Sequence, residues 1–283
     1  MTKKIAWVTD TAAFLTPEFI KEHNIHVLAL NIVFEEGPLR ETVDMTHDEF
    51  YDKLRNAKTH PKTSQPTFGE HVALYEKLKQ EGYDCAIAIH TSERLSGTVA
   101  TSPMAAEQAG FKNYAIDSLI GSYPMQAMLE KGMELEKKGL EPEQIVTEIL
   151  AMREKGELAF IPESLEQPHK SGRVSGTAMF ISNLLNIKLV IQYNPEGGIE
   201  VAQKVRAEKR AKKVVIEKLQ CAIEKSPVKE VAIINCNNER GAIAWKQELQ
   251  QQFPNITFTP TALSACVGVH AGEGTLGLTW VRE

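Results

Sequence analysis

The sequence predicts an α/β fold in two lobes, and three observations support this. Short apolar runs alternate with amphipathic stretches of helical length, which is the rhythm of a sheet covered by helices. The runs 27–34 and 228–235 are almost continuously apolar, as in strands that are buried on both faces. The segment 194–198, Asn-Pro-Glu-Gly-Gly, lies between two strand-like runs and predicts a hairpin turn. We therefore expect an N-terminal lobe with a doubly wound, mostly parallel sheet and a C-terminal α/β lobe with some antiparallel strands.

The individual elements follow from the same patterns. The expected strands are apolar runs bounded by polar or turn residues: 5–9, 27–34, 85–90, 114–117, 158–161, 189–193, 228–235, 257–263 and 276–281. The expected helices are amphipathic stretches between them: 68–81, 104–109, 125–138, 143–155, 207–225 and 241–253. The charged helix ends near Gly156, just before the apolar run 158–161. We place the lobe boundary there, so that the lobes span 1–156 and 157–283.

Composition excludes several classes of function. Of the 283 residues, 42% are hydrophobic and 24% are charged, which is typical of a globular protein. The net charge of −5 argues against nucleic acid as a partner. No run of 18 apolar residues exists, so stable membrane insertion is not expected, although transient contact with a membrane stays open. The N-terminus leads directly into a strand, and the four cysteines are scattered, so we expect a cytoplasmic protein with reduced thiols.

Two segments combine hydroxyl side chains with a helix start. In 62–67, Thr63, Ser64 and an amide side chain precede the helix expected from residue 68. This segment is either a capping loop ended by Thr67 or a ligand-binding loop. In 91–98, Ser96 and Gly97 follow the strand that ends at His90, and the carboxyl end of such a strand faces the ligand crevice of an α/β sheet. Ser96 either caps the next helix or, together with the helix-end amides, binds an anion.

The glycine-rich tail and two basic segments are the other candidates. Gly272, Gly274 and Gly277 match the spacing of a dinucleotide loop, but too few residues follow for a βαβ unit, so we expect a tight loop that carries His270 near the cleft. Residues 169–176 carry Arg173, and a second basic cluster contains Arg206. Both are either solvated surface or contacts for a phosphate or an acidic partner. The eight histidines show no metal-binding spacing, so no metal is expected.

Taken together in order, five motifs resemble the DegV family of fatty-acid-binding proteins. The motifs span essentially the whole chain, so that 3–282 is expected to form one DegV-like unit. They are Val-Thr-Asp-Thr-Ala at 8–12, Lys-Thr-Ser-Gln-Pro at 62–66, Leu-Ser-Gly-Thr at 95–98, Ser-Gly-Arg-Val-Ser at 171–175 and Gly-Val-His-Ala-Gly-Glu-Gly-Thr-Leu-Gly at 268–277. The chain departs from the family pattern in having Thr11 for Ser, Phe14 where an acidic residue is common, Pro168 before the arginine loop and Ser171 for Gly.

The resemblance implies a lipid-binding subunit rather than an enzyme. It implies that a long-chain fatty acid lies in a buried channel and that its carboxylate meets Thr63 or Ser64 and Ser96, with His270 nearby. It also implies presentation of the carboxylate to a separate ATP-dependent kinase subunit, which would make an acyl phosphate. Arg173 and Arg206 would dock that subunit or steer its phosphates. The chain has no Walker loop, and no cofactor is expected beyond the bound acid.

Three alternatives stay open from the sequence. The first is a serine hydrolase acting on lipid esters through Ser96 and His270, completed by Asp10 or Asp117. The second is a phosphotransfer or sugar-kinase-like module, and the third is a regulatory or scaffold protein. The sequence does not specify acyl chain length, unsaturation or oligomeric state.

Overall fold

A computed structural model describes residues 3–164, 166–175 and 187–283. One sheet is fully parallel, in the order β2-β1-β6-β7. Its strands are β2 (His26–Leu28), β1 (Ile5–Asp10), β6 (Cys85–His90) and β7 (Asn113–Asp117). Because the strands are parallel, β1 and β6 end at the same edge of the sheet, and the loops that follow them start side by side.

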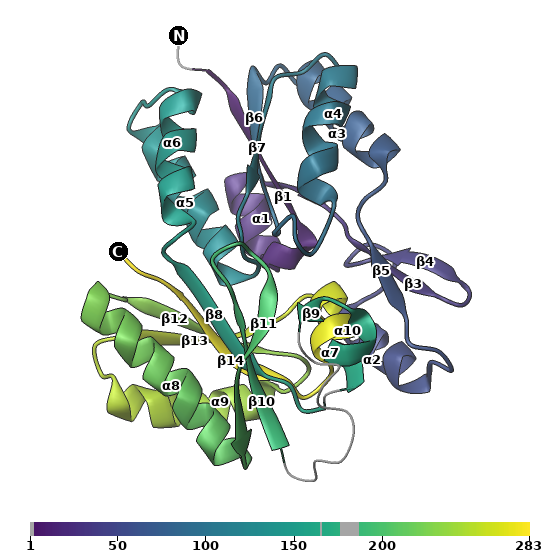
Figure 1. The fold of residues 1–283 in the computed structure, drawn as a ribbon. Coiled ribbons are helices and arrows are strands. Elements are labelled where there is room, and N and C mark those ends of the chain that lie inside the picture. Colours follow the sequence, from purple (N-terminus) through teal and green to yellow (C-terminus); the bar gives the residue numbers. More distant parts are fainter. Residues whose placement is uncertain (1–2, 165, 176–186) are drawn as a thin grey trace.

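Helices cover both faces of the parallel sheet (Figure 1). Along β1, Ile5 and Trp7 pack with α5 (Tyr123–Lys137) and α6 (Pro142–Met152). The alternate residues Ala6 and Val8 pack with α3 (Phe68–Gln80) and α4 (Thr98–Gln108). The two-residue period of a strand thus buries apolar side chains on both sides, which confirms the predicted doubly wound sheet.

The second sheet has seven strands and mixed direction, in the order β13-β12-β14-β8-β10-β11-β9. Its strands are β8 (Gly156–Ile161), β9 (Val174–Ser175), β10 (Ile187–Tyr193), β11 (Ile199–Arg206), β12 (Glu230–Asn235), β13 (Thr257–Ala262) and β14 (Leu276–Val281). The pairs from β12 through β11 are antiparallel, so the predicted antiparallel pairing is confirmed. The expected hairpin turn closes between β10 and β11, where the Asn194 amide donates to the Gly198 carbonyl at 2.8 Å.

Two apolar layers enclose this mixed sheet. One face packs with α8 (Glu208–Lys225) and α9 (Glu239–Gln252). The opposite face packs with α2 (His47–Asn56), α10 (Ala265–Ala271) and the small antiparallel sheet β4-β3-β5. The small sheet consists of β3 (Asn31–Phe34), β4 (Gly37–Arg40) and β5 (Lys62–Ser64). Since α2 and β3 share a core with the second half of the chain, a division into lobes at Gly156 remains a proposal.

The structure differs from the prediction in several elements. The run 27–34 is two strands in two different sheets, because the chain leaves β2 and the Leu30 amide donates to the Thr11 hydroxyl at 3.1 Å before β3 begins. Among the described residues, five helices were not predicted, and four of them are η1 (Thr11–Ala13), α1 (Pro17–His23), α2 and α10 (Ala265–Ala271). The signal for α2 was a capping box, in which Thr46 and Glu49 bond each other's backbone amides. The short helix α7 (Glu166–Ser171) was not predicted either.

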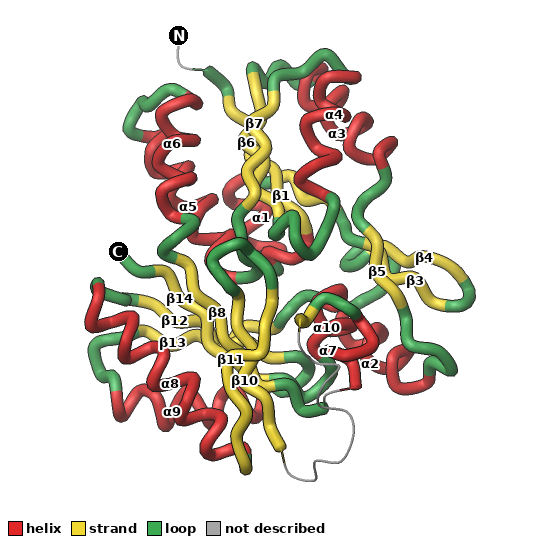
Figure 2. Tube along the Cα trace, in the orientation of Figure 1, coloured by secondary structure: helices red, strands yellow, loops and turns green. Residues whose placement is uncertain are grey.

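Most of the long helices lie on the outside, and many of the loops lie between the two main sheets (Figure 2). This arrangement brings the ends of β1 and β6 toward α10 and the β10–β11 hairpin (Figure 1). No helix in the described ranges is long and apolar enough to cross a membrane.

Candidate functional site

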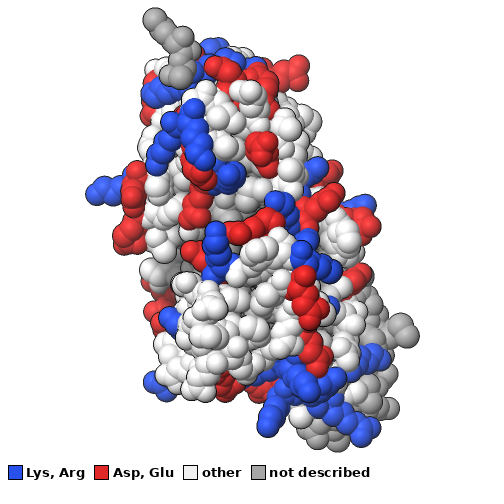
Figure 3. Space-filling view, turned by 90° about the vertical axis from the view of Figure 1, so that its left-hand side faces the viewer, with Lys and Arg blue, Asp and Glu red and all other residues white. Residues whose placement is uncertain are grey.

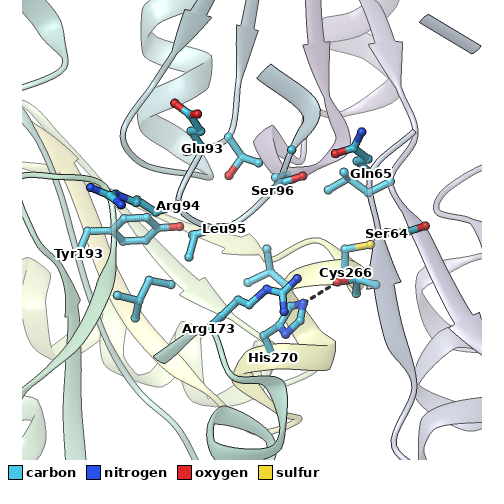
Figure 4. Close-up of a pocket in the computed structure, with 17 residues that line it drawn as sticks. Ser64, Gln65, Glu93, Arg94, Leu95, Ser96, Arg173, Tyr193, Cys266 and His270 are labelled. Atoms are coloured by element: carbon cyan, nitrogen blue, oxygen red, sulfur yellow. Dashed lines mark hydrogen bonds between the residues drawn. The ribbon is translucent and has the colours of Figure 1, made fainter. Parts of the chain in front are cut away.

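A cavity of about 450 Å³ lies where the loops after β1 and β6 meet β5, α10 and the β10–β11 hairpin (Figure 4). Much of its wall is apolar, with a band of hydroxyl and amide side chains. The residues that line it are Ala12, Leu30, Thr63, Ser64, Gln65, Thr91, Glu93, Arg94, Leu95, Ser96, Gly97, Arg173, Tyr193, Ile199, Cys266, Val267 and His270. All four residues expected to meet a carboxylate are among them.

His270 and Thr63 form a direct polar contact at the cavity wall. The Thr63 hydroxyl lies 2.7 Å from Nε2 of His270 (Figure 4). His270 belongs to the last turn of α10, so the expectation that it sits on a tight loop was wrong. Ser264 caps this helix by accepting from the Val267 amide, and the glycines that predicted a loop lie in and after the helix.

His270 is neutral at physiological pH. The pKa of its imidazole is lowered to about 4, mainly by burial and to a smaller extent by the charges of Arg173 and His60. Its Nδ1 has no hydrogen-bond partner among the described residues. When Nε2 carries the proton, the ring donates to the Thr63 oxygen, and the Thr63 O–H is then free to donate into the cavity. The pair therefore offers a carboxylate an uncharged donor.

The Ser96 loop supplies a second set of donors. The Ser96 hydroxyl is 2.8 Å from the Thr98 hydroxyl, and α4 begins at Thr98 with Gly97 as its N-cap and no side-chain cap. The capping role considered for Ser96 is therefore not observed, whereas Thr67 caps α3 as expected. The free amides at the start of α4 carry the positive end of the helix dipole, which favours a negative ligand group.

The two hydroxyl loops interlock through Gln65. Its side-chain Nε2 donates to the Thr101 hydroxyl at 2.6 Å, and its backbone carbonyl accepts from Asn31 Nδ2 at 3.1 Å. A Cβ at Gly97 would lie 2.0 Å from Gln65 Oε1, so a larger residue at this position would force the Gln65 amide to move. The side chain of Gln65 thus links the segment that carries Thr63 to α4, which follows the Ser96 loop.

Asp10, at the end of β1, holds the loop after β6 in place through hydrogen bonds. Its Oδ2 accepts from the Thr91 amide at 3.0 Å and lies 3.1 Å from His90 Nδ1, while His90 Nε2 lies 3.2 Å from the Ser102 hydroxyl. The order carboxylate, imidazole, hydroxyl is that of a hydrolase triad. However, Asp10, His90 and Ser102 are all completely buried, so a substrate cannot reach the hydroxyl. The network holds the loop in place.

The triad considered for a serine hydrolase does not assemble. Ser96 contacts Thr98, and His270 contacts Thr63. Asp10 faces His90, and Asp117 accepts from the Leu119 amide at 2.9 Å. No hydrogen bond among the described residues joins Ser96 to His270, so a general base for Ser96 is missing from this arrangement.

Comparison with known proteins gives the family. A sequence model described as the DegV family of uncharacterised proteins matches residues 4–283. The chain belongs to the DegV family. Protein DegV of Bacillus subtilis is 33% identical over 278 residues, covering 98% of each chain. A DegV domain-containing protein of Listeria innocua is 31% identical over 281 residues, covering 99% of each.

Solved structures share this fold over the full length. The crystal structure of DegV from Bacillus subtilis, described as a fatty acid binding protein, is 32% identical, with a TM-score of 0.89 and coverage of 99% of this chain and 100% of that one. A fatty acid binding DegV family protein from Streptococcus agalactiae is 28% identical, with a TM-score of 0.91 and coverage of 99% of both chains.

Within this DegV chain, the hydroxyl pair after Lys62 separates into two roles. The side chain of Thr63 reaches His270, whereas Ser64 is exposed and points away from the space between Ser96, Tyr193 and His270 (Figure 4). Successive residues of a strand face opposite sides, and both lie on β5. Thr63 is therefore the better candidate of the two for a carboxylate contact.

The two candidate arginines lie in different places. Arg173 lines the cavity and is exposed. Among the described residues, its guanidinium donates one hydrogen bond, to the Ser171 carbonyl at 3.3 Å. Arg206 lies at the end of β11, seven residues beyond the cavity-lining Ile199. At about 3.3 Å per residue, this separation is roughly 23 Å. Arg206 is thus too far from the cavity to contact a phosphate bound there, and only a docking role remains for it.

Several cavity residues escaped the sequence analysis. Gln65 belongs to a quoted motif, but its link to α4 depends on tertiary structure. Tyr193, Ile199 and Cys266 come from segments that were interpreted as strand or core, and apolar periodicity does not separate cavity wall from core.

Glu41 was also not predicted. It is buried, and burial raises the pKa of its carboxyl to about 7. It accepts from the Thr11 hydroxyl at 2.8 Å and from the Ala265 amide. Glu41 therefore ties the loop after β1 to the start of α10, which carries His270.

Proposed function

We propose that this DegV protein binds one long-chain fatty acid in the cavity and holds its carboxylate with Thr63, Ser96 and His270. The main support for the proposal is that polar and apolar side chains occupy different parts of the cavity wall. Uncharged donors gather around Thr63 and the Ser96 loop, while Leu30, Ile199 and other apolar side chains form most of the remaining surface. The fatty acid binding described for the similar proteins of Bacillus subtilis and Streptococcus agalactiae supports the same ligand class.

The energetics favour an acyl ligand held mainly by its tail. Burying one methylene contributes about 0.8 kcal/mol, so a sixteen-carbon tail offers roughly 12 kcal/mol before the costs of association. That amount is sufficient for nanomolar affinity. The carboxylate then needs orientation more than charge pairing, and neutral hydroxyls with helix-end amides provide hydrogen bonds without a buried ion pair.

Native mass spectrometry tests this proposal. The protein purified from cells, or delipidated and incubated with stearate, is expected to carry one fatty acid per chain, which extraction then identifies. Val267→Trp should abolish the loaded species because Val267 lines the cavity, whereas Ile243→Trp, on the exposed face of α9, should not. A chain that stays unliganded with every long-chain acid, or a Val267→Trp variant that loads normally, contradicts the proposal.

We also propose that the bound carboxylate is presented to a separate ATP-dependent kinase. The family resemblance suggests this step, and two features are compatible with it. Arg173 lies exposed at the cavity, next to the proposed carboxylate position. A dense group of Lys and Arg side chains lies at the lower end of the face shown in Figure 3, and the first turns of α8 after Arg206 are rich in exposed basic residues. The four cysteines are free, in keeping with the cytoplasm, where such a kinase and ATP would be found.

Arg206 allows the clearer test of docking because it does not line the cavity. Arg206→Glu is expected to slow acyl phosphate formation by the cognate kinase at limiting kinase concentration, with fatty acid affinity retained. The matched control is Arg240→Glu, which reverses an exposed arginine on α9. Equal turnover of the wild type and both variants would remove Arg206 from the docking surface.

A further inference from the structure

A small inner chamber adjoins the main cavity. Its volume is about 40 Å³, and it shares five wall residues with the main cavity: Arg173, Tyr193, Ile199, Val267 and His270. The rest of its wall is almost entirely apolar and includes Leu158, Phe160 and Leu263. Two hydroxyl groups interrupt this apolar wall, those of Ser122 and Tyr193.

The hydroxyl of Ser122 has no partner among the described residues. Ser122 is 2% exposed, and its Oγ is buried without a hydrogen bond. Ser122 is the N-cap of α5, yet its side chain makes no capping bond there. Its backbone has φ 63° and ψ −144°, a region that non-glycine residues rarely occupy, and its amide donates to the Ala12 carbonyl at 2.9 Å. The fold therefore holds this hydroxyl at the chamber wall without using it.

The hydroxyl of Tyr193 lies close by. A Cβ at Gly121, the residue before Ser122, would lie 3.1 Å from the Tyr193 oxygen, so glycine keeps the space beside that oxygen open. The phenol points into the main cavity (Figure 4), and no hydrogen bond among the described residues involves its oxygen. Burial, together with the negative charge of Asp10, raises the pKa of Tyr193, so its O–H remains a hydrogen-bond donor at any physiological pH.

We infer that these two hydroxyls recognise an oxygen atom on the acyl chain, so that the preferred ligand is a hydroxy or oxo fatty acid rather than a plain one. A buried hydroxyl without a partner is unfavourable, and a hydrocarbon tail leaves both hydroxyls unpaired. A chain oxygen accepts from Tyr193 and Ser122 and removes this penalty. Sites built to bond a hydroxyl discriminate against the analogue that lacks it. This inference rests on the proposed binding of a fatty acid.

Competition binding tests the inference and separates it from the proposed function. Stearic acid and a set of hydroxystearic acids that differ only in the position of the hydroxyl compete against a fluorescent fatty acid. We expect at least one mid-chain hydroxystearic acid to bind about tenfold more tightly than stearic acid, the effect of about one or two net hydrogen bonds. If no acid binds, the proposed function fails. If all bind but none exceeds stearic acid, the proposed function stands and the chain-oxygen site is rejected.

Two variants test whether the hydroxyls of Tyr193 and Ser122 are the groups that recognise the chain oxygen. Tyr193→Phe and Ser122→Ala, made singly, should each reduce the affinity ratio of the hydroxy acid to stearic acid several-fold. Because the ratio is taken within each variant, a general loss of affinity does not imitate the effect. The controls are Tyr114→Phe and Ser226→Ala, whose hydroxyls donate to Glu143 and to the Glu283 carbonyl outside the cavity. A ratio that neither cavity variant changes overturns the assignment, even if the wild type prefers the hydroxy acid.

Discussion

Replacing Thr63 by valine removes a single hydroxyl from the cavity and keeps the shape of the side chain. Valine is β-branched like threonine and suits the strand position on β5. The change removes the donor proposed for the carboxylate and leaves His270 Nε2 without its partner at 2.7 Å. A hydrogen bond to a charged group contributes about 1.5–3 kcal/mol, so the dissociation constant for stearate should rise about ten- to hundred-fold.

Isothermal titration calorimetry at neutral pH measures this loss directly. Thr147→Val is the matched control, because its hydroxyl donates to the Glu143 carbonyl on the exposed surface of α6. The affinity of that variant should equal the wild-type value. If Thr63→Val is folded and binds stearate as tightly as the wild type, the carboxylate does not depend on this hydroxyl, and the reasoning about the head group is refuted.

Three further predictions concern stability, measured by urea unfolding. Because the pKa of His270 is lowered in the folded protein, its imidazole takes up a proton in the unfolded chain at a higher pH than in the folded one. The free energy of unfolding should therefore fall by about 3 kcal/mol as the pH drops from about 6.5 to about 4. The variant His270→Asn should lack this fall. The raised pKa of Glu41 gives the opposite pH dependence, because its carboxyl ionises in the unfolded chain at a lower pH than in the folded one. The free energy of unfolding should therefore fall by about 3 kcal/mol as the pH rises from about 4.5 to about 7. The variant Glu41→Gln should lack this fall. Gly277→Ala should lower stability by about 1–3 kcal/mol or more, because the added Cβ would lie 2.6 Å from both the Ala159 carbonyl oxygen and the Phe160 Cβ. If His270→Asn or Glu41→Gln shows the same dependence of stability on pH as the wild type, the pKa shift inferred for that residue is wrong. If Gly277→Ala is as stable as the wild type, the close packing inferred around Gly277 is wrong.

Local patterns in the sequence were enough to predict the architecture. Both faces of β1 are apolar, and the turn at 194–198 contains the residues that a hairpin requires, so the parallel sheet and the β10–β11 pair were both predicted. The break between β2 and β3 was missed because the run 27–34 is almost continuously apolar. At this break, the Leu30 amide donates to the hydroxyl of Thr11, a residue that lies 19 positions earlier in the sequence.

The site was predictable only in part, for a similar reason. The motifs pointed to Thr63, Ser96 and His270, and these residues do line one cavity. However, the glycines around His270 suggested a loop, while the cap by Ser264 and packing of Val269 and Ala271 in the core stabilise a helix. The interlock of Gln65 with α4 and the buried carboxyl of Glu41 depend on contacts between segments far apart in sequence, which local propensity does not contain.

A crystal structure of the protein with stearate bound tests the central claim most directly. We expect the carboxylate within hydrogen-bonding distance of the hydroxyls of Thr63 and Ser96, and the alkyl tail against Leu30 and Ile199 in the cavity. An acid bound elsewhere on the molecule, or a carboxylate turned toward solvent with Thr63 and Ser96 uncontacted, would contradict the account.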